Sequence, residues 1–198
     1  MDSSRITRET YDQVAAEFAS RNAIPWPELD RMMAAFLGRL PERPRVLDAG
    51  CGPGRDTLLL RGRGARAVGL DLSFGMLRAQ SLARAVQADM RALPVRDRAV
   101  AAVWCQAAML HVPRPDVPRV LGEFARVTRP SGVLHLAVSE GDGEGWEHGA
   151  YGSNHSRWFV HHRLEPLRAL LAEAGWTVVD TERLHYVRDW LYVLAHRT

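Results

Sequence analysis

The sequence predicts an α/β protein with a largely parallel sheet. Segments of helical and strand character alternate through most of the 198 residues, which is typical of stacked βαβ units. The composition, with 46% hydrophobic and 25% charged residues, is that of a globular protein with a real core. No repeat or low-complexity tract interrupts the pattern. A chain of this length fits one domain, so we expect a single domain over residues 1–198.

Two helices are expected before the sheet. Residues 7–21 have the spacing of an amphipathic helix, and a second helix is predicted at 27–40. Pro27 suits the first turn of that helix because its missing N–H is not needed there, and Phe36 belongs to the apolar face. We therefore expect residues 1–40 to form a helical cap.

Short apolar runs separated by turns predict the sheet and its crossover helices. After residue 140 comes a glycine-rich stretch without a regular period, up to residue 162, and then a closing helix and hairpin at 163–198. We expect strands at 45–49, 66–70, 84–87, 99–105, 132–139, 176–184 and 187–195, and helices at 55–61, 73–80, 116–127 and 163–174.

The strongest local signal is the strand at 45–49 that runs into Gly50-Cys51-Gly52-Pro53-Gly54 and then into a helix. Glycines allow positive φ and a close approach of the backbone to a ligand, and the N–H groups at the helix start form a polar cradle. A dinucleotide fingerprint would place the third glycine one residue later. Asp48 is ill-suited to a pyrophosphate but suits a cationic amino group. The turn therefore favours S-adenosylmethionine over NAD.

Two further carboxylates follow the next strands. Asp71 ends the second strand, about 20 residues after the loop, where it can accept both ribose hydroxyls of an adenosine. Asp89 follows the third strand and can take the exocyclic amine of adenine. Ligands of open α/β sheets bind at the carboxyl ends of the strands, which is where all three acidic residues are expected.

With these motifs the chain resembles the class I S-adenosylmethionine-dependent methyltransferases of the small-molecule type, whose motifs read D-x-G-C-G-x-G, then an acidic strand end, then A-D. The resemblance spans nearly the whole chain. It extends to the segments 102–105 (AVWC), 110–113 (LHVP), 129–134 (RPSGVL) and 170–176 (LLAEAGW), with Ser131 where the family usually has glycine.

The resemblance implies a Rossmann-like sheet of seven mostly parallel strands with the last strand antiparallel, and a cofactor-binding core at 45–140. The cofactor, S-adenosyl-L-methionine, would lie across the carboxyl edge of the sheet. Its expected contacts come from the N-terminus and from the ends of the first four strands: Tyr11, Asp48, Ala49, Gly50, Cys51, Gly52, Gly54, Asp71, Leu72, Met76, Ala88, Asp89, Met90, Cys105 and Gln106. Among these, Tyr11 resembles an N-terminal tyrosine that folds over the cofactor in many relatives.

Methyl transfer from a sulfonium is a direct displacement, so alignment and a desolvated pocket matter more than an elaborate set of catalytic residues. His111 is the candidate general base because it follows the fourth strand on the active edge, although a structural role is the alternative. His135 lies within a strand pattern and is expected to be a core residue.

The segment 140–162 is rich in aromatic and titratable residues and is expected to be a lid over the acceptor. Trp146, Tyr151, Arg157 and Trp158 are its candidate substrate-binding residues. The histidine spacings match no tetrahedral ligand set, so no metal site is expected.

Charge and cysteine content bound the remaining possibilities. The net charge of +3 comes from scattered arginines, and Cys51 and Cys105 form no disulfide or zinc pattern. We expect a cytoplasmic enzyme, without membrane segments, that acts as a monomer or homodimer and methylates an oxygen or nitrogen of a small-molecule acceptor. An RNA or tRNA methyltransferase and a cofactor-binding module without turnover are the alternatives, with nucleic acid the less expected partner.

Overall fold

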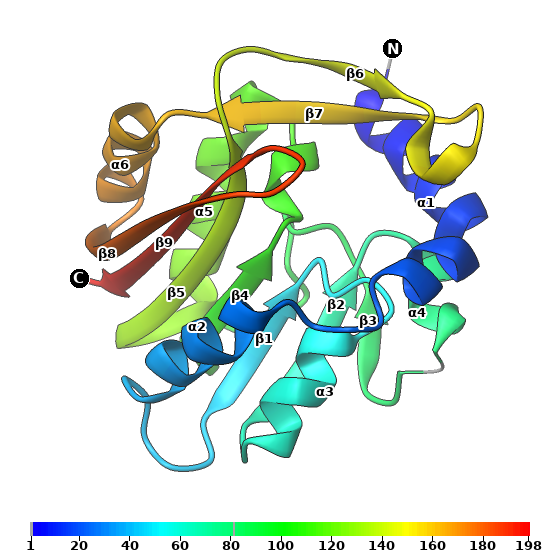
Figure 1. Cartoon of the computed structure of the whole chain (residues 1–198). Coiled ribbons are helices and arrows are strands. Elements are labelled where there is room, and N and C mark those ends of the chain that lie inside the picture. The colour runs from blue at the N-terminus through cyan, green and yellow to red at the C-terminus, as the bar shows by residue number, and fades with distance from the viewer. Residues whose placement is uncertain (1, 81) are drawn as a thin grey trace.

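A mixed sheet forms the centre of the computed structural model, which describes residues 2–80 and 82–198 (Figure 1). Strands β1 to β5 pair with one another in parallel, and β9, the last strand of the chain, runs antiparallel to β5. In spatial order the strands are β3 (Ala85–Gln87), β2 (Arg66–Asp71), β1 (Arg45–Ala49), β4 (Val100–Gln106), β5 (Thr128–Glu140), β9 (Asp189–Arg197) and β8 (Trp176–His185). The predicted fold class, including its antiparallel last strand, is confirmed.

Helices cover both faces of this sheet because alternate strand residues point to opposite sides. On one face α2 (Pro27–Leu37) and α3 (Arg55–Gly62) pack on a cluster that contains Phe36 and Trp104. On the other face α5 (Val117–Val127) and α6 (Leu164–Glu173) pack on a cluster that contains Val103 and Cys105. Consecutive residues of β4 thus belong to two separate cores.

The first helix, α1 (Ser3–Arg21), is tied to α4 (Phe74–Ala79) beside the sheet. Asp12 of α1 accepts hydrogen bonds from the hydroxyl of Ser73 at 2.6 Å and from the backbone N–H of Gly75 at 2.8 Å. A Cβ atom at Gly75 would lie 2.6 Å from the Asp12 carbonyl oxygen, so only glycine permits this approach. The contact fixes α1 over the end of β2.

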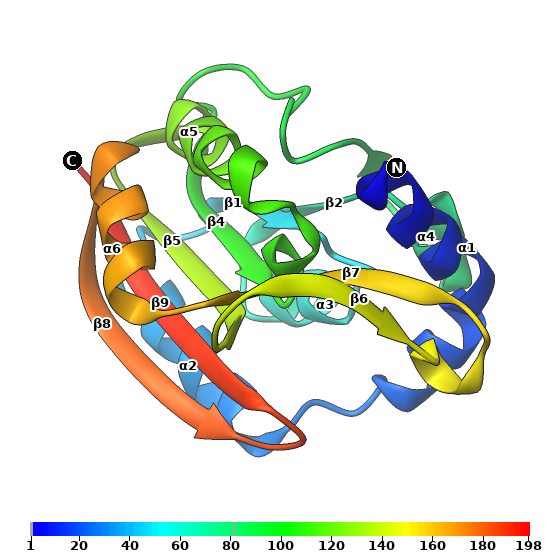
Figure 2. The same ribbon diagram turned by 90° about the horizontal axis from the view of Figure 1, so that it is seen from above.

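The segment 140–162, expected to be irregular, contains an antiparallel hairpin. Strands β6 (Glu144–His148) and β7 (Ser156–His162) pair, with the short helix η3 (Ala150–Gly152) between them, and β7 also pairs with the end of β5. Seen from above, the hairpin crosses the sheet and reaches α1 (Figure 2). Its few residues per strand and its glycines hide the alternation on which a strand prediction depends.

Other boundaries differ by a turn or less. The helix expected at 27–40 ends at Leu37, where the N–H of Gly38 bonds to the Ala34 carbonyl, and the first helix begins at Ser3 with Asp2 as its N-cap. Two further short helices, η1 (Met109–His111) and η2 (Arg114–Asp116), connect β4 to α5. Within residues 2–80 and 82–198, no helix is both long and apolar enough to cross a membrane.

Candidate active site

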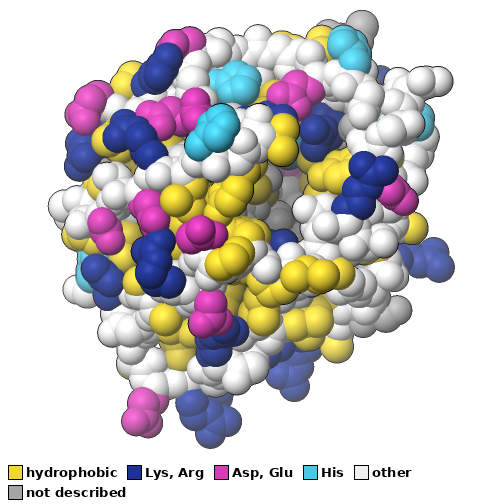
Figure 3. Space-filling model, viewed as in Figure 1, with side chains coloured by type: hydrophobic (Ala, Val, Ile, Leu, Met, Phe, Trp, Pro, Cys, Tyr) yellow, Lys and Arg dark blue, Asp and Glu magenta, His cyan; other side chains and the backbone are white. Residues whose placement is uncertain are grey.

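A cavity of about 490 Å³ lies at the carboxyl ends of the parallel strands. Hydrophobic side chains gather around a hollow in the middle of the face shown in Figure 3. We call the part formed by the segments after β1, β2 and β3 the loop half: Asp48, Gly50, Cys51, Gly52, Asp71, Leu72, Met76, Ala88, Asp89 and Met90. We call a second group of lining residues, which is rich in rings, the aromatic half: Tyr11, Phe18, Trp26, Gln106, His111, Tyr151, Arg157, Phe159, Tyr186, Arg188, Trp190 and Tyr192.

The glycine-rich turn of the loop half has a conformation that requires glycine. Gly50 has a φ of +76°, and a Cβ atom there would lie 2.1 Å from the Cβ of Ala108. The N–H groups of Gly50 and Cys51 both donate to the Leu70 carbonyl, at 2.7 and 2.9 Å, which holds the turn against the end of β2. The space that a side chain would need at Gly50 is filled by Ala108, so the absent Cβ lets the turn pack closely on the segment after β4.

Asp71 joins this turn to the next loop. Its carboxylate accepts the N–H of Gly52 at 2.8 Å and the N–H of Ser73 at 2.8 Å. Burial raises the pKa of Asp71 to about 6, although these two N–H groups lower it. A carboxylate oxygen has more than one lone pair, so Asp71 can still accept hydrogen bonds from ligand hydroxyls.

Two carboxylates lie at the junction of the halves. Asp48 is 1% exposed and accepts the hydroxyl of Thr57 at 2.5 Å, while Asp56 accepts the indole N–H of Trp104 at 3.0 Å and the Nε of Arg55 at 2.7 Å. Burial raises the pKa of Asp48, and the carboxylate of Asp56 raises it further. The guanidinium of Arg55 pairs with Asp56, and a cationic amino group bound beside Asp48 would favour the ionised form that burial disfavours.

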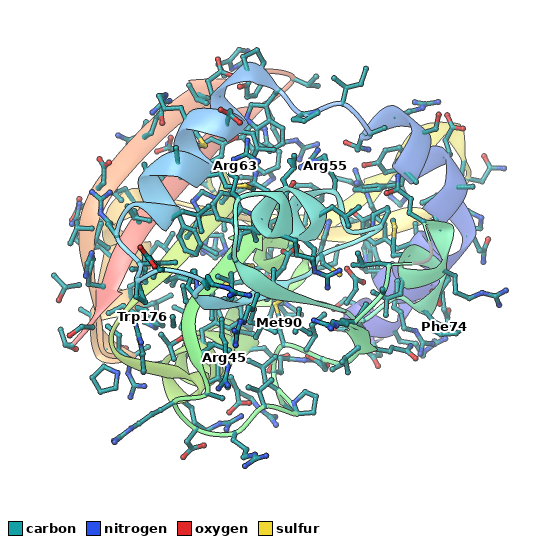
Figure 4. The ribbon with its side chains drawn as sticks, turned by 90° about the horizontal axis from the view of Figure 1, so that it is seen from below. Arg45, Arg55, Arg63, Phe74, Met90 and Trp176 are labelled. Atoms are coloured by element: carbon teal, nitrogen blue, oxygen red, sulfur yellow. The ribbon has the colours of Figure 1, made fainter. Side chains whose placement is uncertain are left out.

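Arg55 also closes the aromatic side of this junction. Its guanidinium lies 4.8 Å from the ring centroid of Trp26 and donates to the Asn22 carbonyl at 3.2 Å. Figure 4 labels Arg55 on α3 and Met90 after β3, two cavity residues that come from different segments of the chain. The linker between α1 and α2 is thereby fixed to the start of α3.

Asp89 meets an arginine as well as the cavity. Arg91 approaches both of its carboxylate oxygens, at 2.6 and 3.1 Å, and also bonds to Asp116 at 2.7 Å. Burial raises the pKa of Asp89, but the hydrogen bonds from Arg91 outweigh it, so the pKa lies below its usual range. Asp89 is therefore an ionised acceptor at neutral pH.

His111 is the hub of the aromatic half. Its Nδ1 lies 2.7 Å from the Trp158 carbonyl oxygen, and its Nε2 lies 2.7 Å from the Tyr11 hydroxyl. A carbonyl oxygen only accepts, so Nδ1 carries the proton and Nε2 accepts the hydrogen of Tyr11. Burial lowers the pKa of His111 to about 3, so the ring is neutral at pH 7.

Two arginines give the aromatic half a positive charge. Arg157 and Arg188 share the carboxylate of Glu147, at 3.3 and 2.7 Å, and both lie near the ring of Phe159, at 5.1 and 4.2 Å from its centroid. Arg157 also donates to the Tyr11 hydroxyl at 3.1 Å. Two guanidinium groups against one carboxylate leave a net positive charge beside the neutral His111.

Most of the expected cofactor and substrate residues line this cavity, but five do not. Cys105 packs in the core under α5, and Ala49 and Gly54 are likewise absent from the lining. Trp146 and Trp158, expected at the acceptor, pack against each other at 5.2 Å between ring centroids and lie outside the cavity. The reason is strand alternation, because the neighbours of Trp158 in β7, Arg157 and Phe159, are the ones that point inward.

Several cavity residues were not among the expected site residues. They come from the linker before α2, the start of α3, β7 and the last hairpin: Trp26, Arg55, Phe159, Arg188, Trp190 and Tyr192. Trp190 and Tyr192 stand two apart in a predicted strand, so the sequence indicates that they share a face. It does not indicate that this face meets the cavity. Among the described residues, no three His, Cys, Asp or Glu side chains gather as metal ligands would.

A family model described as a methyltransferase domain matches residues 47–136. A malonyl-[acyl-carrier protein] O-methyltransferase from Laribacter hongkongensis is 33% identical over 212 residues, which cover 95% of this chain and 69% of that protein. One from Enterobacter lignolyticus is 38% identical over 122 residues, covering 58% of this chain and 48% of that protein. The chain spans about half the length of several of the curated relatives it matches.

Solved structures show the same fold. The magnesium protoporphyrin IX methyltransferase from Synechocystis PCC 6803, solved with bound S-adenosylmethionine, has a TM-score of 0.79 against this chain. Its identity is 18%, over 100% of this chain and 98% of that one. A 1,6-didemethyltoxoflavin-N1-methyltransferase from Burkholderia thailandensis, solved with bound 1,6-didemethyltoxoflavin and S-adenosylhomocysteine, has a TM-score of 0.74 at 21% identity, covering 98% of this chain and 88% of that one. The chain belongs to the class I S-adenosylmethionine-dependent methyltransferases.

Proposed function

We propose that the protein transfers the methyl group of S-adenosylmethionine to an oxygen or nitrogen of a small-molecule acceptor, and that the acceptor carries a carboxylate. The observation that carries the proposal is the continuity of one cavity from the glycine-rich turn of the loop half to the arginines of the aromatic half. A cofactor and a small acceptor can thus lie in one enclosure at the strand ends.

The loop half supplies the cofactor contacts. Gly50 and Gly52 hold the turn at positive φ, Asp71 can accept ribose hydroxyls, and Asp48 with Asp56 fits the amino group of the methionine part. When bound, the cofactor supplies an electrophilic methyl group on a sulfonium. The residues of the chain then have to align the acceptor and exclude water.

The positive charge of the aromatic half supports an acidic acceptor. Arg157 is 15% exposed and Arg188 27% exposed, and Glu147 neutralises only one of the two. Planar guanidinium groups are suited to bind carboxylates by paired hydrogen bonds. The curated relatives are named for malonyl groups on an acyl-carrier protein, and a malonyl group bears a free carboxylate.

A carboxylate acceptor would need no general base, because its nucleophilic oxygen carries no proton at neutral pH. This agrees with the surroundings of His111, whose two ring nitrogens are already used by the Trp158 carbonyl and the Tyr11 hydroxyl. We assign His111 a positioning role for Tyr11 under this proposal. Its action as a base, expected from the sequence, stays a prediction for acceptors that must lose a proton.

The first experiment is a calorimetric titration with S-adenosylmethionine, S-adenosylhomocysteine and NAD in parallel. Micromolar affinity for both adenosyl ligands and none for NAD is the expected result, and binding of NAD alone would contradict the cofactor assignment. Methyl transfer from labelled cofactor is then measured with malonyl-coenzyme A, a malonyl-loaded acyl-carrier protein, neutral aromatic phenols and bulk tRNA. Transfer to the carboxylate acceptors supports the proposal.

The same panel separates the alternatives. Transfer to tRNA with a steep loss of binding as salt rises would point to an RNA methyltransferase. Tight cofactor binding without transfer to any acceptor of a broad panel would point to a binding module. Transfer to the phenols alone would retain the enzyme class but contradict the acidic acceptor.

A further inference from the structure

His135 is buried in the middle of the sheet beside the cavity. It lies on β5, in register with Trp104 of β4 and Leu194 of β9, and is 3% exposed. Its ring stacks on Trp104 with 3.6 Å between centroids and an interplanar angle of 10°. A histidine held this firmly can direct a hydrogen bond along one line.

That hydrogen bond goes to Gln106, the last residue of β4. The Nε2 of His135 lies 2.9 Å from the Oε1 of Gln106. An amide oxygen accepts and does not donate, so the Nε2 of His135 carries the proton. Burial lowers the pKa of His135 to about 3, so the ring stays neutral and keeps donating across the physiological range.

The amide of Gln106 is thereby oriented. With its oxygen turned to His135, the amino group is left for other partners. Gln106 on β4 and Tyr192 on β9 are both in register with Ala137, on the two sides of β5. Burial raises the pKa of Tyr192, and a hydrogen bond from the Gln106 side chain lowers it, as a donor to the phenol oxygen would. Gln106 and Tyr192 both line the aromatic half.

We propose that His135 is a positioning residue: it fixes the Gln106 amide so that the amino group of Gln106 and the hydroxyl of Tyr192 form a pair of donors on the wall of the aromatic half. Such a wall selects an acceptor molecule with a carbonyl or carboxylate oxygen at this point and disfavours one with an N–H group there. The opposite amide orientation would select for the N–H group. The inference rests on the proposed function and names a second feature of its substrate.

The surroundings support a fixed amide. Trp104, on which His135 stacks, donates its indole N–H to Asp56, so the stack cannot turn without breaking a buried hydrogen bond. Phe36 closes the edge of His135 at 6.4 Å between ring centroids. If the indole N–H of Trp104 or the Nε2–H of His135 lost its partner, a buried donor would be left without a hydrogen bond. This cost favours the one orientation of both rings.

The first test needs no acceptor. Nitrogen-15 spectra of the histidine rings are recorded on protein saturated with S-adenosylhomocysteine from pH 5 to 8, with the His135 signals assigned from His135→Phe. We expect a neutral ring with the proton on Nε2 throughout. A neutral ring protonated on Nδ1, or a charged ring at pH 6, would overturn the proposal.

The second test uses malonyl-coenzyme A as the probe acceptor. His135→Phe keeps a flat ring on Trp104 but removes the donor, and we expect about a tenfold higher KM for the probe, with kcat and the affinity for S-adenosylhomocysteine within about twofold. Tyr192→Phe should raise KM similarly, and the double variant should raise it by less than the product. His135→Gln, which can donate to the same oxygen, should recover most of the loss.

The matched control is His162→Phe, the same change at a buried histidine that lines a separate small pocket. An unchanged KM in His135→Phe, or an equal rise in His162→Phe, overturns the inference. Thermal unfolding of each variant shows whether it is folded. If the wild type fails to methylate the probe, the acceptor in the proposed function is contradicted, and the tautomer measured in the first test still decides the role of His135.

Discussion

The two halves of the cavity are built in different ways. The loop half comes from one stretch of chain, from Asp48 to Met90, and presents main-chain groups and carboxylates. The aromatic half gathers side chains from α1, the linker before α2, β7 and β9, which are far apart in the sequence. The first half has a geometry fixed by a turn and two strand ends, whereas the second depends on the packing of separate elements.

The difference teaches how one fold can keep a cofactor and vary an acceptor. The turn at Gly50 and Gly52 is fixed by positive φ angles, which do not depend on the side chains of the hairpins. The acceptor wall can change with single substitutions on the hairpins while the sheet stays the same. Changes in the two halves should therefore separate into effects on cofactor affinity and effects on acceptor KM.

The largest expected effect is in the loop half. Asp71→Ala removes the acceptor of two backbone N–H groups and of the ligand hydroxyls, so we expect at least a 100-fold loss of affinity for S-adenosylhomocysteine, about 3 kcal/mol, by calorimetry. Asp97→Ala, at a side chain 72% exposed, is the control and should bind normally. Normal affinity in Asp71→Ala would refute the assignment of this half.

Sequence reasoning was most successful for the loop half for a local reason. The order strand, glycine turn and helix is visible in residues 45–61, and the strand ends at Asp71 and Asp89 follow from the same period. The role of Asp56 was not foreseen, because an acidic residue in the first turn of a helix usually means only a favourable dipole contact.

The aromatic half could not be predicted as well, because its contacts join distant segments. Arg157 was expected at the acceptor and lines the cavity, but Trp158, the next residue, faces away. To separate Arg157 from Trp158, one must know that 156–162 is a strand and which of its faces meets the cavity. Arg188 lies in the turn between β8 and β9, and no local pattern indicates that this turn meets the cavity.

The next effect sharpens the comparison from the other side. Arg157→Met removes one of the two guanidinium groups at the acceptor end, and we expect about a 30-fold higher KM for malonyl-coenzyme A, with the affinity for S-adenosylhomocysteine within about twofold. Arg157→Lys should restore only part of the loss, since an ammonium cannot make the paired contact.

The control for this substitution is Arg163→Met, at an exposed arginine that pairs with Asp142. It should leave both constants unchanged. An equal loss of cofactor affinity in Arg157→Met would mean that the positive charge of the aromatic half serves the carboxylate of the cofactor instead of the acceptor.

The smallest expected effect is on stability, where the two halves respond to acid with opposite signs. His111 has a folded pKa of about 3, below its unfolded value, so its contribution is present above about pH 6.5 and is lost as the pH falls. Asp71 has a folded pKa raised to about 6, so it binds a proton more readily in the folded state. Its contribution to stability therefore rises as the pH falls, whereas that of His111 is lost.

Substitution of His111 isolates one of these terms. The free energy of unfolding is measured for the wild type and for His111→Phe by chemical unfolding without ligand. The value for the wild type, relative to that for the variant, should fall by about 1 kcal/mol between pH 7 and pH 5.5. The phenylalanine keeps the edge contacts with Tyr11 and Phe159. A constant difference would mean that His111 titrates normally, and the neutral hub that joins Tyr11 to β7 would then have to be abandoned.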